Sequence, residues 1–317
     1  MQKRNLGKSM KVSSVGLGCM GITHASGTPL TKAEGMKVLE SALEIGYNFF
    51  DTAECYTGTN PDGTVAYNEE VVGAVLKPVR NKVILASKCG VTHGKDHLIM
   101  DSRPQSIRKA LEGSLKRLGT DYIDLYYQHR IDPKVEPEEV AGTMSDLMKE
   151  GKIRAWGISE TDEAYLRRAH SVCPVTAIQN RYSMMARWYE NLFPVVEELG
   201  ITYVAFSPLA NGFLSGQYNE KSSFEKGADF RSNMPQYTPE LLQMLRDMAA
   251  EKNATPGQIS LAWMLCKKTF IVPIPGSRKP ERLKENFEAA NICLSQDEIA
   301  VIDEKLNTME LLVFGGH

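Results

Sequence analysis

Hydrophobic and polar residues follow two spacings along this chain of 317 residues. Short runs rich in β-branched and aromatic residues predict strands, whereas longer stretches with apolar residues three and four positions apart predict helices. Eight strands are predicted in this way, at residues 15–18, 47–50, 83–87, 123–128, 153–158, 176–179, 201–206 and 270–274. A short polar segment at residues 7–9 predicts the turn of a further hairpin ahead of them.

Stretches with helical spacing lie between these strands. Thr31 and Glu34 form a capping box that starts a helix over residues 31–45, and Gly46 ends it. The predicted apolar face of this helix consists of Ala33, Met36, Leu39 and Leu43.

Strand and helix alternate along the whole chain, without a linker rich in Pro, Gly and Ser. Helical spacing recurs between Arg103 and Gly119 and over residues 137–149. Eight β-then-α units favour a single (β/α)8 TIM barrel domain over residues 1–317, with an N-terminal β-hairpin and extra C-terminal helices. A doubly wound open α/β sheet is the alternative. The long irregular segment 211–237 is expected to be a functional lid.

The charge balance limits the possible partners. With 37 Lys and Arg against 39 Asp and Glu, the net charge is −2, so the chain lacks the positive field that holds a nucleic-acid backbone. No apolar run approaches the ~18 residues of a membrane-spanning helix, and the polar start lacks a secretory signal. Six cysteines without a Cys-x-x-Cys pair fit free thiols, which predicts a cytoplasmic protein without nucleic-acid or membrane partners.

Candidate catalytic residues follow three neighbouring strands. In a barrel of parallel strands the reactive side chains lie where the strands end, because the loops at that end share one concave surface. Asp51, Lys88 and His129 follow the second, third and fourth predicted strands, and neighbouring strands lie ~4.8 Å apart. Tyr56, in the loop after Asp51, can reach back over the same pocket.

These four residues have complementary chemistry. A phenol with a pKa of ~10 is a poor proton donor at neutral pH, and the ammonium of Lys88 is expected to lower the pKa of Tyr56. A buried lysine needs an anionic partner, and Asp51 is the available one. His129 can then form a hydrogen bond with a substrate carbonyl. Each residue alone is more often structural, and their joint placement favours a catalytic site.

The other strand ends suit a flat ring that carries a carboxamide. The fifth predicted strand ends in Ser159, the sixth in Gln179, and the seventh in Phe206 and Ser207. An aromatic face beside hydroxyl and amide groups matches nicotinamide. Ordinary polar strand ends are the alternative interpretation.

The loop after the eighth strand is basic. Arg278, Lys279 and Arg282 lie around a predicted helix start, where cations oppose the helix dipole unless an anion binds there. The bidentate geometry of arginine favours a phosphomonoester, such as the 2′-phosphate that distinguishes NADP from NAD. A solvated basic turn is the alternative.

Two other motifs are rejected. Residues 16–21 contain the Gly-x-Gly-x-x-Gly pattern of dinucleotide-binding turns, but residues 22–29 include Gly and Pro, so no helix start follows to hold a pyrophosphate. His93 and His97 have the spacing of a metal-binding pair, yet Gly94 argues against a helix there, and no metal is predicted.

At these residues the chain resembles the aldo-keto reductase superfamily, from the predicted hairpin to about Asn307. The segments that carry the resemblance are Gly16-Leu17-Gly18-Cys19-Met20-Gly21, Asp51-Thr52-Ala53-Glu54-Cys55-Tyr56, Ser87-Lys88, Gln128-His129-Arg130, Gly151-Lys152-Ile153-Arg154, Gly157-Ile158-Ser159-Glu160 and Phe206-Ser207-Pro208-Leu209-Ala210. Microbial and plant members that share the Tyr-Tyr-Gln-His-Arg stretch at residues 126–130 look the most similar.

The resemblance implies an enzyme in which NADPH reduces an aldehyde or ketone while Tyr56 donates the proton, supported by Asp51, Lys88 and His129. By the same resemblance, NADPH or NADP+ would contact Met20, Gly21, Asp51, Ser159, Gln179, Phe206, Ser207, Pro208, Leu209, Gly212, Leu214, Gly276, Ser277, Arg278, Arg282, Glu285 and Asn286. Three positions depart from common family patterns: Phe206 replaces Tyr, Glu160 replaces Asn, and Asn211 replaces a basic residue.

Other functions remain as alternatives. Potassium-channel β subunits resemble the same family and act as cofactor-sensing binding partners, although they often carry an N-terminal inactivating segment and this chain enters its hairpin at once. A metal-dependent barrel hydrolase would need a ligand cluster that the sequence lacks. Trp188 and residues 311–317 are candidates for lining the substrate pocket, and the oligomeric state is left open, with a monomer compatible.

Overall fold

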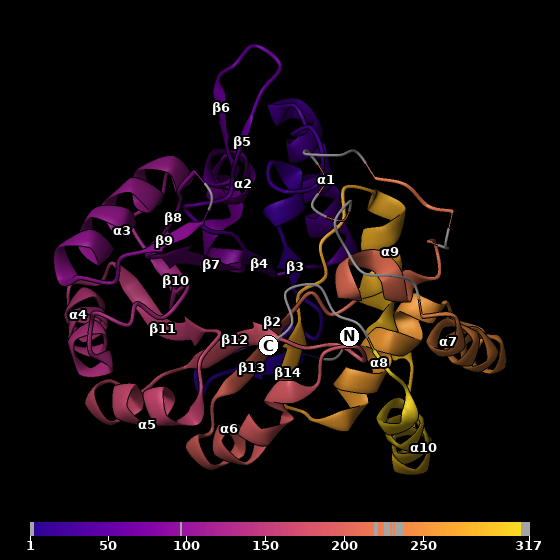
Figure 1. Ribbon diagram of the computed structural model, residues 1–317. Coiled ribbons are helices and arrows are strands. Elements are labelled where there is room, and N and C mark those ends of the chain that lie inside the picture. The colour runs from indigo at the N-terminus through magenta and orange to yellow at the C-terminus, as the bar shows by residue number, and fades with distance from the viewer. Residues whose placement is uncertain are drawn as a thin grey trace.

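The computed structural model describes residues 3–95, 97–218, 221–224, 229, 231 and 238–311. At its centre is a sheet of eight parallel strands in the order β14-β13-β12-β11-β10-β7-β4-β3 (Figure 1). The strands are β3 (Leu17–Gly18), β4 (Phe49–Asp51), β7 (Ile84–Cys89), β10 (Ile123–Gln128), β11 (Ile153–Ser159), β12 (Ala177–Arg181), β13 (Thr202–Phe206) and β14 (Ile271–Pro273). Each overlaps one predicted run, which confirms the eight strand predictions.

The first and last strands meet, and the sheet thereby closes into a barrel. The backbone N–H of Gly16 donates to the carbonyl oxygen of Pro273 at 2.9 Å. A Cβ on Gly18 would lie 2.7 Å from the carbonyl oxygen of Ile274, so glycine permits this close approach. The predicted (β/α)8 barrel is confirmed, and the open doubly wound sheet is wrong.

Helices surround the barrel (Figure 1). They are α1 (Lys32–Ile45), α2 (Asn68–Leu76), α3 (Pro104–Leu118), α4 (Pro137–Lys149), α5 (Glu163–Val172), α6 (Phe193–Leu199), α7 (Pro239–Lys252), α8 (Pro256–Lys267), α9 (Pro280–Glu288) and α10 (Gln296–Thr308). The element order places both α7 and α8 between β13 and β14, and α10 after α9. The predicted extra C-terminal helices are therefore present.

Helix α1 shows one correct and one wrong prediction. Its capping box forms as expected, because the Thr31 side chain accepts from the Glu34 backbone while the Glu34 side chain accepts from Thr31, and Gly46 ends the helix at a φ of 115°. The expected apolar face is partly wrong. Ala33 is exposed, and the buried residues are Gly35, Val38, Leu39 and Ala42. Gly35 and Ala42 are small enough for the helix to approach its neighbours, and a face read from large apolar residues overlooks them.

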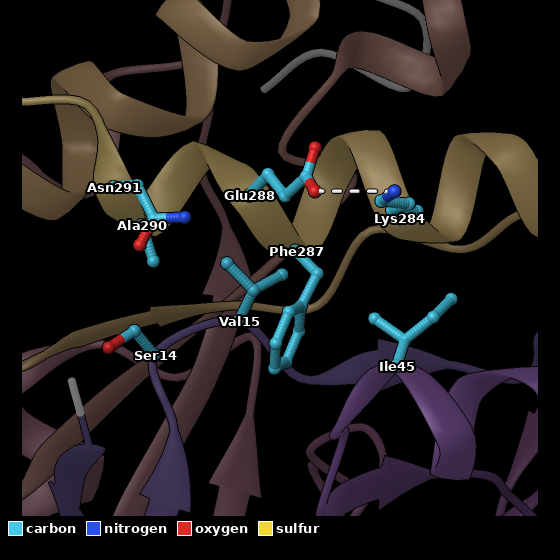
Figure 2. A pocket seen from close by; sticks show the side chains of 8 residues that line it. All are labelled: Ser14, Val15, Ile45, Lys284, Phe287, Glu288, Ala290 and Asn291. Carbon is cyan, nitrogen blue, oxygen red and sulfur yellow. Dashed lines mark ion pairs between the residues drawn. The ribbon is translucent and has the colours of Figure 1, made fainter. Parts of the chain in front are cut away.

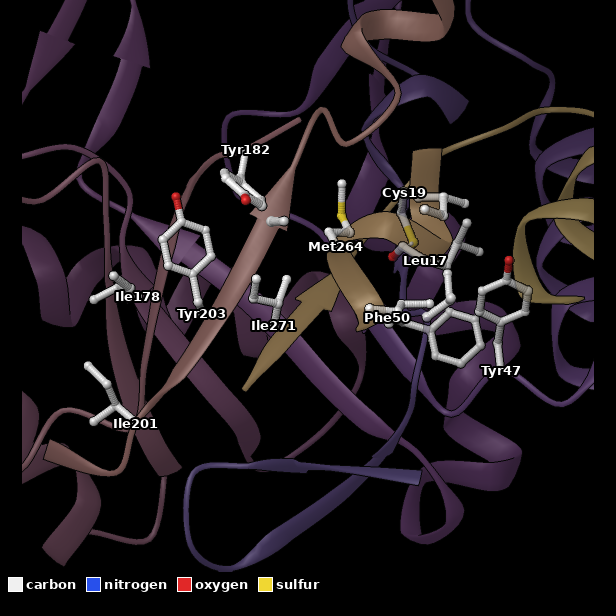
Figure 3. Close-up of a cluster of buried hydrophobic side chains, with 14 of the residues drawn as sticks. Leu17, Cys19, Tyr47, Phe50, Ile178, Tyr182, Ile201, Tyr203, Met264 and Ile271 are labelled. Carbon is white, nitrogen blue, oxygen red and sulfur yellow. Dashed lines mark hydrogen bonds between the residues drawn. The ribbon is translucent and has the colours of Figure 1, made fainter. Parts of the chain in front are cut away.

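Two apolar layers stabilise the fold. The outer layer lies between strands and helices, where Phe50 of β4, Tyr203 of β13 and Met264 of α8 belong to one buried cluster (Figure 3). The inner layer fills the barrel with inward residues such as Phe49, Leu125 and Val204. The barrel is thus a packed core.

The predicted N-terminal hairpin pairs β1 (Lys3–Leu6) with β2 (Met10–Ser13) and covers one end of the barrel. Leu6 and Val12 are fully buried and join the inner apolar layer. The backbone N–H of Gly7 donates to the hydroxyl of Thr202, the first residue of β13, at 2.8 Å. The hairpin therefore closes the amino ends of the strands and leaves their carboxyl ends for the site.

Two further hairpins rise from the carboxyl ends of the strands: β5 (Thr57–Thr59) with β6 (Val65–Tyr67), and β8 (Val91–His93) with β9 (Leu98–Met100). Short 3-10 helices occur at η1 (Met20–Ile22), η2 (Lys77–Lys82), η3 (Trp188–Leu192), η4 (Ala210–Ser215) and η6 (Ala289–Asn291). The Gly-rich turn of residues 16–21 runs into η1, and α1 begins only at Lys32, so the rejection of a dinucleotide-binding helix start is confirmed.

The expected lid, residues 211–237, is described only in part. Its first five residues, 211–215, belong to η4, with non-helical backbone angles at Asn211 and Gly212. Residues 219–220, 225–228, 230 and 232–237, and residues 312–317 of the tail, lie outside the described residues. Within the described ranges, no helix is both long and apolar enough to cross a membrane.

Candidate active site

The carboxyl ends of β4 and β7 hold a compact polar group around Lys88. Its Nζ lies 2.5 Å from Oδ1 of Asp51 and donates to the carbonyl oxygen of Thr52 at 2.8 Å. The same Nζ lies 3.3 Å from the hydroxyl of Tyr56. The ammonium group therefore joins a carboxylate to a phenol, in an environment where Lys88 and Asp51 are buried.

Burial and pairing set the charges of this group. Burial disfavours the ammonium form, but attraction to Asp51 and Tyr56 outweighs it and raises the pKa of Lys88. Burial raises the pKa of Asp51, and the bonds from Lys88 and Gln179 oppose that shift. Lys88 therefore stays positively charged at neutral pH, beside the phenol of Tyr56.

The expected direction of the Tyr56 pKa is wrong. Burial raises this pKa by more than Lys88 lowers it, so the net shift is upward. The phenol keeps its proton at neutral pH, as a proton donor must. Lys88 then acts by stabilising the phenolate that remains once the proton has left.

His129, directly after β10, approaches Tyr56 from the side. The two rings meet edge to face, with centroids 5.7 Å apart. Burial lowers the pKa of His129 well below its usual value, and Lys88 and Arg130 lower it further, so the ring is neutral. Its Nδ1 lies 3.4 Å from the Cys55 thiol.

The Cys55 thiol faces the Nδ1 nitrogen of His129. Burial raises the pKa of this thiol to about 12, so it stays protonated and can donate to Nδ1. The neutral ring then has its proton on Nε2, where it can donate to a carbonyl oxygen. The sequence analysis did not assign Cys55, although its place next to Tyr56 is a usable signal.

Gln179 connects this group to the next two strands. Its Nε2 donates to Oδ2 of Asp51 at 2.8 Å, which leaves its carbonyl oxygen as an acceptor. Ser159 of β11 lies opposite Gln179 of β12 in the sheet register. The Ser159 hydroxyl accepts from Nη1 of Arg130 at 3.1 Å, so its own proton is available to a ligand. Together they offer a donor and an acceptor to a carboxamide.

Phe206 ends β13 and presents a half-buried ring beside two guanidinium groups. The Cζ atoms of Arg130 and Arg181 lie 5.8 Å and 5.5 Å from its centroid. Nη1 of Arg130 also donates to the carbonyl oxygen of His129 at 2.6 Å. Arg130 therefore bridges the proton-donating residues and Ser159, a role that the sequence analysis missed because it considered only the first residue after each strand.

The chain after Phe206 forms an unusual turn over residues 207–212. Ser207, Ala210 and Asn211 have φ values of 49°, 46° and 58°, and Gly212 has 98°. Left-handed residues other than glycine are strained, and they persist where function requires them. Within this turn the backbone N–H groups of Ala210 and Gly212 donate to the carbonyl oxygens of Ser207 and Leu209, each at 2.9 Å. Pro208 and Leu214 are buried on either side of this turn, and Leu209 is half-buried.

The predicted phosphate residues lie beyond β14, and Arg278 connects two loops. Its Nε donates to the carbonyl oxygen of Gly21 at 2.5 Å and its Nη1 to that of Thr28 at 2.9 Å, while Nη2 is buried and has no hydrogen-bond partner in the described part of the chain. A buried unsatisfied guanidinium N–H is a site where an anion would bind favourably. Met20 lies in η1 beside Gly21.

The other residues of this region are already paired. Arg282 forms an ion pair with Glu285, whose other carboxylate oxygen accepts from Thr255 at 2.8 Å. Ser277 accepts from the Lys279 backbone at 3.1 Å. Gly276 packs on the backbone of Gly18, and Asn286 is buried in α9. Arg278 thus stands apart from Arg282 in having a donor left for a ligand.

No metal centre is evident in the parts that the structure describes. No group of three or more His, Cys, Asp or Glu in these parts could hold a metal ion. His93 and His97 lie in the β8–β9 hairpin, where Gly94 donates to His97 at 2.9 Å, so they do not share a helix. A cavity of about 180 Å³ is lined by Val15, by Ile45 at the end of α1 and by Phe287 of α9, with the Lys284–Glu288 ion pair at its edge (Figure 2).

A comparison with known protein families shows which family the chain belongs to. A sequence profile of the Aldo/keto reductase family matches residues 14–307. The chain belongs to the aldo/keto reductase family. Membership makes it an oxidoreductase that acts on carbonyl compounds.

Three relatives illustrate the similarity. The aldo-keto reductase str7 of Strobilurus tenacellus is 37% identical over 326 residues, covering 97% of this chain and 93% of its own. The Schizosaccharomyces pombe aldo-keto reductase yakc, whose name specifies NADP(+), is 35% identical over 316 residues, covering 95% of this chain and 90% of its own. The solved glycerol dehydrogenase AKR11B4 of Gluconobacter oxydans matches with a TM-score of 0.84 and 28% identity, covering 96% of this chain and 94% of its own.

Proposed function

We propose that this reductase uses NADPH to reduce aldehydes and ketones to alcohols, with Tyr56 as the proton donor. The observation that supports this most directly is the position of Lys88 Nζ, 2.5 Å from Asp51 and 3.3 Å from the Tyr56 hydroxyl. Burial keeps the phenol protonated before reaction, and Lys88 stabilises its anion afterwards. When bound, NADPH supplies the hydride that reduces the carbonyl carbon.

The residues of this chain act on the carbonyl oxygen. The hydroxyl of Tyr56 and the Nε2–H of His129 donate to that oxygen and hold it in place. As negative charge develops on the oxygen, Tyr56 transfers its proton to it and becomes a phenolate. The Lys88 ammonium stabilises that phenolate, and Asp51 keeps Lys88 charged inside the barrel.

The residues predicted to hold NADPH fall into three groups. Ser159 and Gln179 offer a hydroxyl donor and an amide acceptor for the carboxamide beside the Phe206 ring. We assign the pyrophosphate to the left-handed turn of residues 207–212. Nη2 of Arg278, which has no hydrogen-bond partner among the described residues, suits the 2′-phosphate, and the NADP(+) in the name of yakc agrees with this choice. We include Met20, Gly21, Gly276, Ser277, Arg282, Glu285 and Asn286 in the same proposal.

Loss of NADPH absorbance with a panel of aldehydes and ketones tests this function. Tyr56→Phe removes only the hydroxyl, and we expect it to lower turnover by about 10²–10⁴-fold while NADPH binding, followed by fluorescence titration, is retained. Full activity of Tyr56→Phe would exclude Tyr56 as the proton donor. No turnover of any carbonyl by the unmodified protein would refute the proposed function.

A further inference from the structure

The first residue of α2, Asn68, is fully buried, and its side chain forms hydrogen bonds with the loops that follow β3 and β4. Its Oδ1 accepts from the hydroxyl of Thr52 at 2.6 Å. Its Nδ2 donates to the carbonyl oxygen of Cys19 at 2.9 Å and to the hydroxyl of Thr23 at 3.0 Å. One amide therefore uses both of its N–H groups and its oxygen to join two loops to the start of a helix.

None of these side-chain hydrogen bonds is formed within α2. The N-cap position of the helix is Tyr67, whose side chain forms no capping bond. Asparagine has a lower helix propensity than alanine, and burying its amide costs free energy unless the polar atoms find partners. The contribution of Asn68 therefore lies in the loops that it contacts.

The same hydrogen bonds extend to the main chain of Tyr56. The hydroxyl of Thr23 donates to the carbonyl oxygen of Tyr56 at 3.3 Å, and the backbone N–H of Asn68 donates to the same oxygen at 3.0 Å. The hairpin of β5 and β6 begins directly after Tyr56 and ends directly before Asn68 (Figure 1). Asn68 thus holds both the base of this hairpin and the residue that precedes it.

Asp51 and Lys88 adjoin the partners of Asn68. The backbone N–H of Cys19 donates to the carbonyl oxygen of Asp51 at 2.8 Å. Thr52 follows Asp51, and its carbonyl oxygen accepts from Nζ of Lys88 at 2.8 Å. The amide of Asn68 is therefore one residue away from both members of the buried ion pair.

The second residue of α2 fixes the helix against β7. Oε1 of Glu69 accepts from the hydroxyl of Ser87 at 2.6 Å, and Oε2 pairs with Arg117 of α3 at 2.7 Å. Glu69 and Ser87 are both buried, and Ser87 directly precedes Lys88. The start of α2 is thus joined to the strand that carries Lys88.

We propose that Asn68 is a positioning residue for the proton donor, whose main chain it holds so that the Tyr56 hydroxyl stays within reach of Lys88 and of the substrate carbonyl. This inference rests on the proposed function, because the position of the phenol affects turnover only if Tyr56 donates the proton. Asn68 is fully buried, so it acts through the main chain of Tyr56 rather than by contact with a substrate. A misplacement of about 1 Å can lower a rate by about 10²-fold.

A double-mutant cycle with Tyr56→Phe tests this role. Asn68→Ala removes the three side-chain hydrogen bonds and keeps the backbone N–H that donates to Tyr56. We expect Asn68→Ala to lower kcat by about 10- to 100-fold, for the aldehyde or ketone of the panel that is turned over fastest. The Kd for NADPH should change by less than about threefold, and kcat is expressed per NADPH-binding site to correct for unfolded protein.

The background of the cycle distinguishes positioning from a general loss of structure. In Tyr56→Phe no phenolic proton is left to position, so Asn68→Ala should lower the residual kcat by less than about twofold. A residue that only stabilises the fold would cause the same fold-loss in both backgrounds.

Thr23→Val is a second variant that keeps nearly the size of the side chain. It removes the hydroxyl that donates to Tyr56 and leaves Asn68 in place. The kcat should fall by about three- to tenfold, the effect of one hydrogen bond. If Asn68→Ala does not fold, Thr23→Val takes its place in the cycle with Tyr56→Phe.

Asn48→Ala provides the matched control. Asn48 directly precedes β4, at the amino end of the barrel. Its Oδ1 accepts from the backbone N–H of Ser13 at 2.6 Å, and its Nδ2 donates to the carbonyl oxygen of Lys11 at 3.2 Å. This variant should lower the free energy of unfolding and leave kcat unchanged.

The outcomes separate this inference from the proposed function. Unchanged kcat in Asn68→Ala and Thr23→Val, with Tyr56→Phe impaired, would overturn the positioning role and leave the proposed function standing. An equal fold-loss from Asn68→Ala in both backgrounds would also overturn the positioning role. Full activity of Tyr56→Phe would overturn both proposals.

Discussion

Removing the charge of Asp51 should leave the Lys88 ammonium without its partner inside the barrel. Asp51→Asn keeps the size of the side chain and removes the charge. At the observed N–O distance of 2.5 Å, the attraction at an effective dielectric constant of ~20 is about 7 kcal/mol, and much of it offsets the desolvation of two buried charges. Loss of one partner of a buried pair lowers the free energy of unfolding by about 3–5 kcal/mol.

A double-mutant cycle isolates the interaction between the two side chains. Lys88→Met removes the other charge with a side chain of similar length, and the double variant buries neither charge. We expect the double variant to be less destabilised than the sum of the single variants, with a coupling energy above about 2 kcal/mol. Urea unfolding of the four proteins measures these free energies.

An exposed ion pair provides the control for this cycle. Arg108 and Glu150 also lie 2.5 Å apart, but their side chains are 39% and 36% exposed. Water and salt screen such a pair, so Arg108→Met and Glu150→Gln should show little coupling. Coupling of the same size in both pairs would refute the argument that burial gives the Asp51–Lys88 pair its strength.

Three further predictions address the cofactor, the pH dependence and the closure of the barrel. Arg278→Ala should weaken NADPH binding at least about tenfold more than NADH binding, measured by titration, and an equal loss would contradict a 2′-phosphate site. Burial raises the pKa of Glu54 from 4.5 to about 7. Between these two pH values the native state keeps a proton that the unfolded chain has lost. The free energy of unfolding should therefore fall by about 2 kcal/mol as the pH rises through this range. Glu54→Gln should flatten that fall in urea unfolding at about pH 5 and about pH 8, and an unchanged slope would assign it to other groups. Gly18→Ala should destabilise by more than about 2 kcal/mol, since its Cβ would lie 2.7 Å from a backbone oxygen, whereas Gly142→Ala, in open space within α4, should stabilise by roughly 0.5–1 kcal/mol.

Sequence patterns predicted the barrel well because its rules are local and repeated. Each parallel strand is a short apolar run, and all carboxyl ends meet at one end of the sheet. The position of Asp51, Lys88 or Gln179 therefore follows from counting to the end of a strand. Residues that lie one position further along, such as Arg130, escape this rule although they reach the same pocket.

Contacts between distant segments and the effects of burial were not predictable. Arg278 bonds to Gly21 and Thr28, which lie at the opposite end of the sequence, and no local pattern encodes that pairing. The predicted direction of the Tyr56 pKa shift is wrong, because a sequence shows the neighbouring charge of Lys88 but not how deeply the phenol is buried.

The N-terminal hairpin makes the two ends of the barrel different, because it covers the amino ends of the strands and leaves the carboxyl ends open. Its turn carries Lys8, an exposed amine at the plugged end, next to Gly200 and the start of β13. A support or fluorescent label coupled to Lys8 would therefore face away from the reacting phenol. Immobilisation through that amine would orient every molecule with its open rim toward the solution.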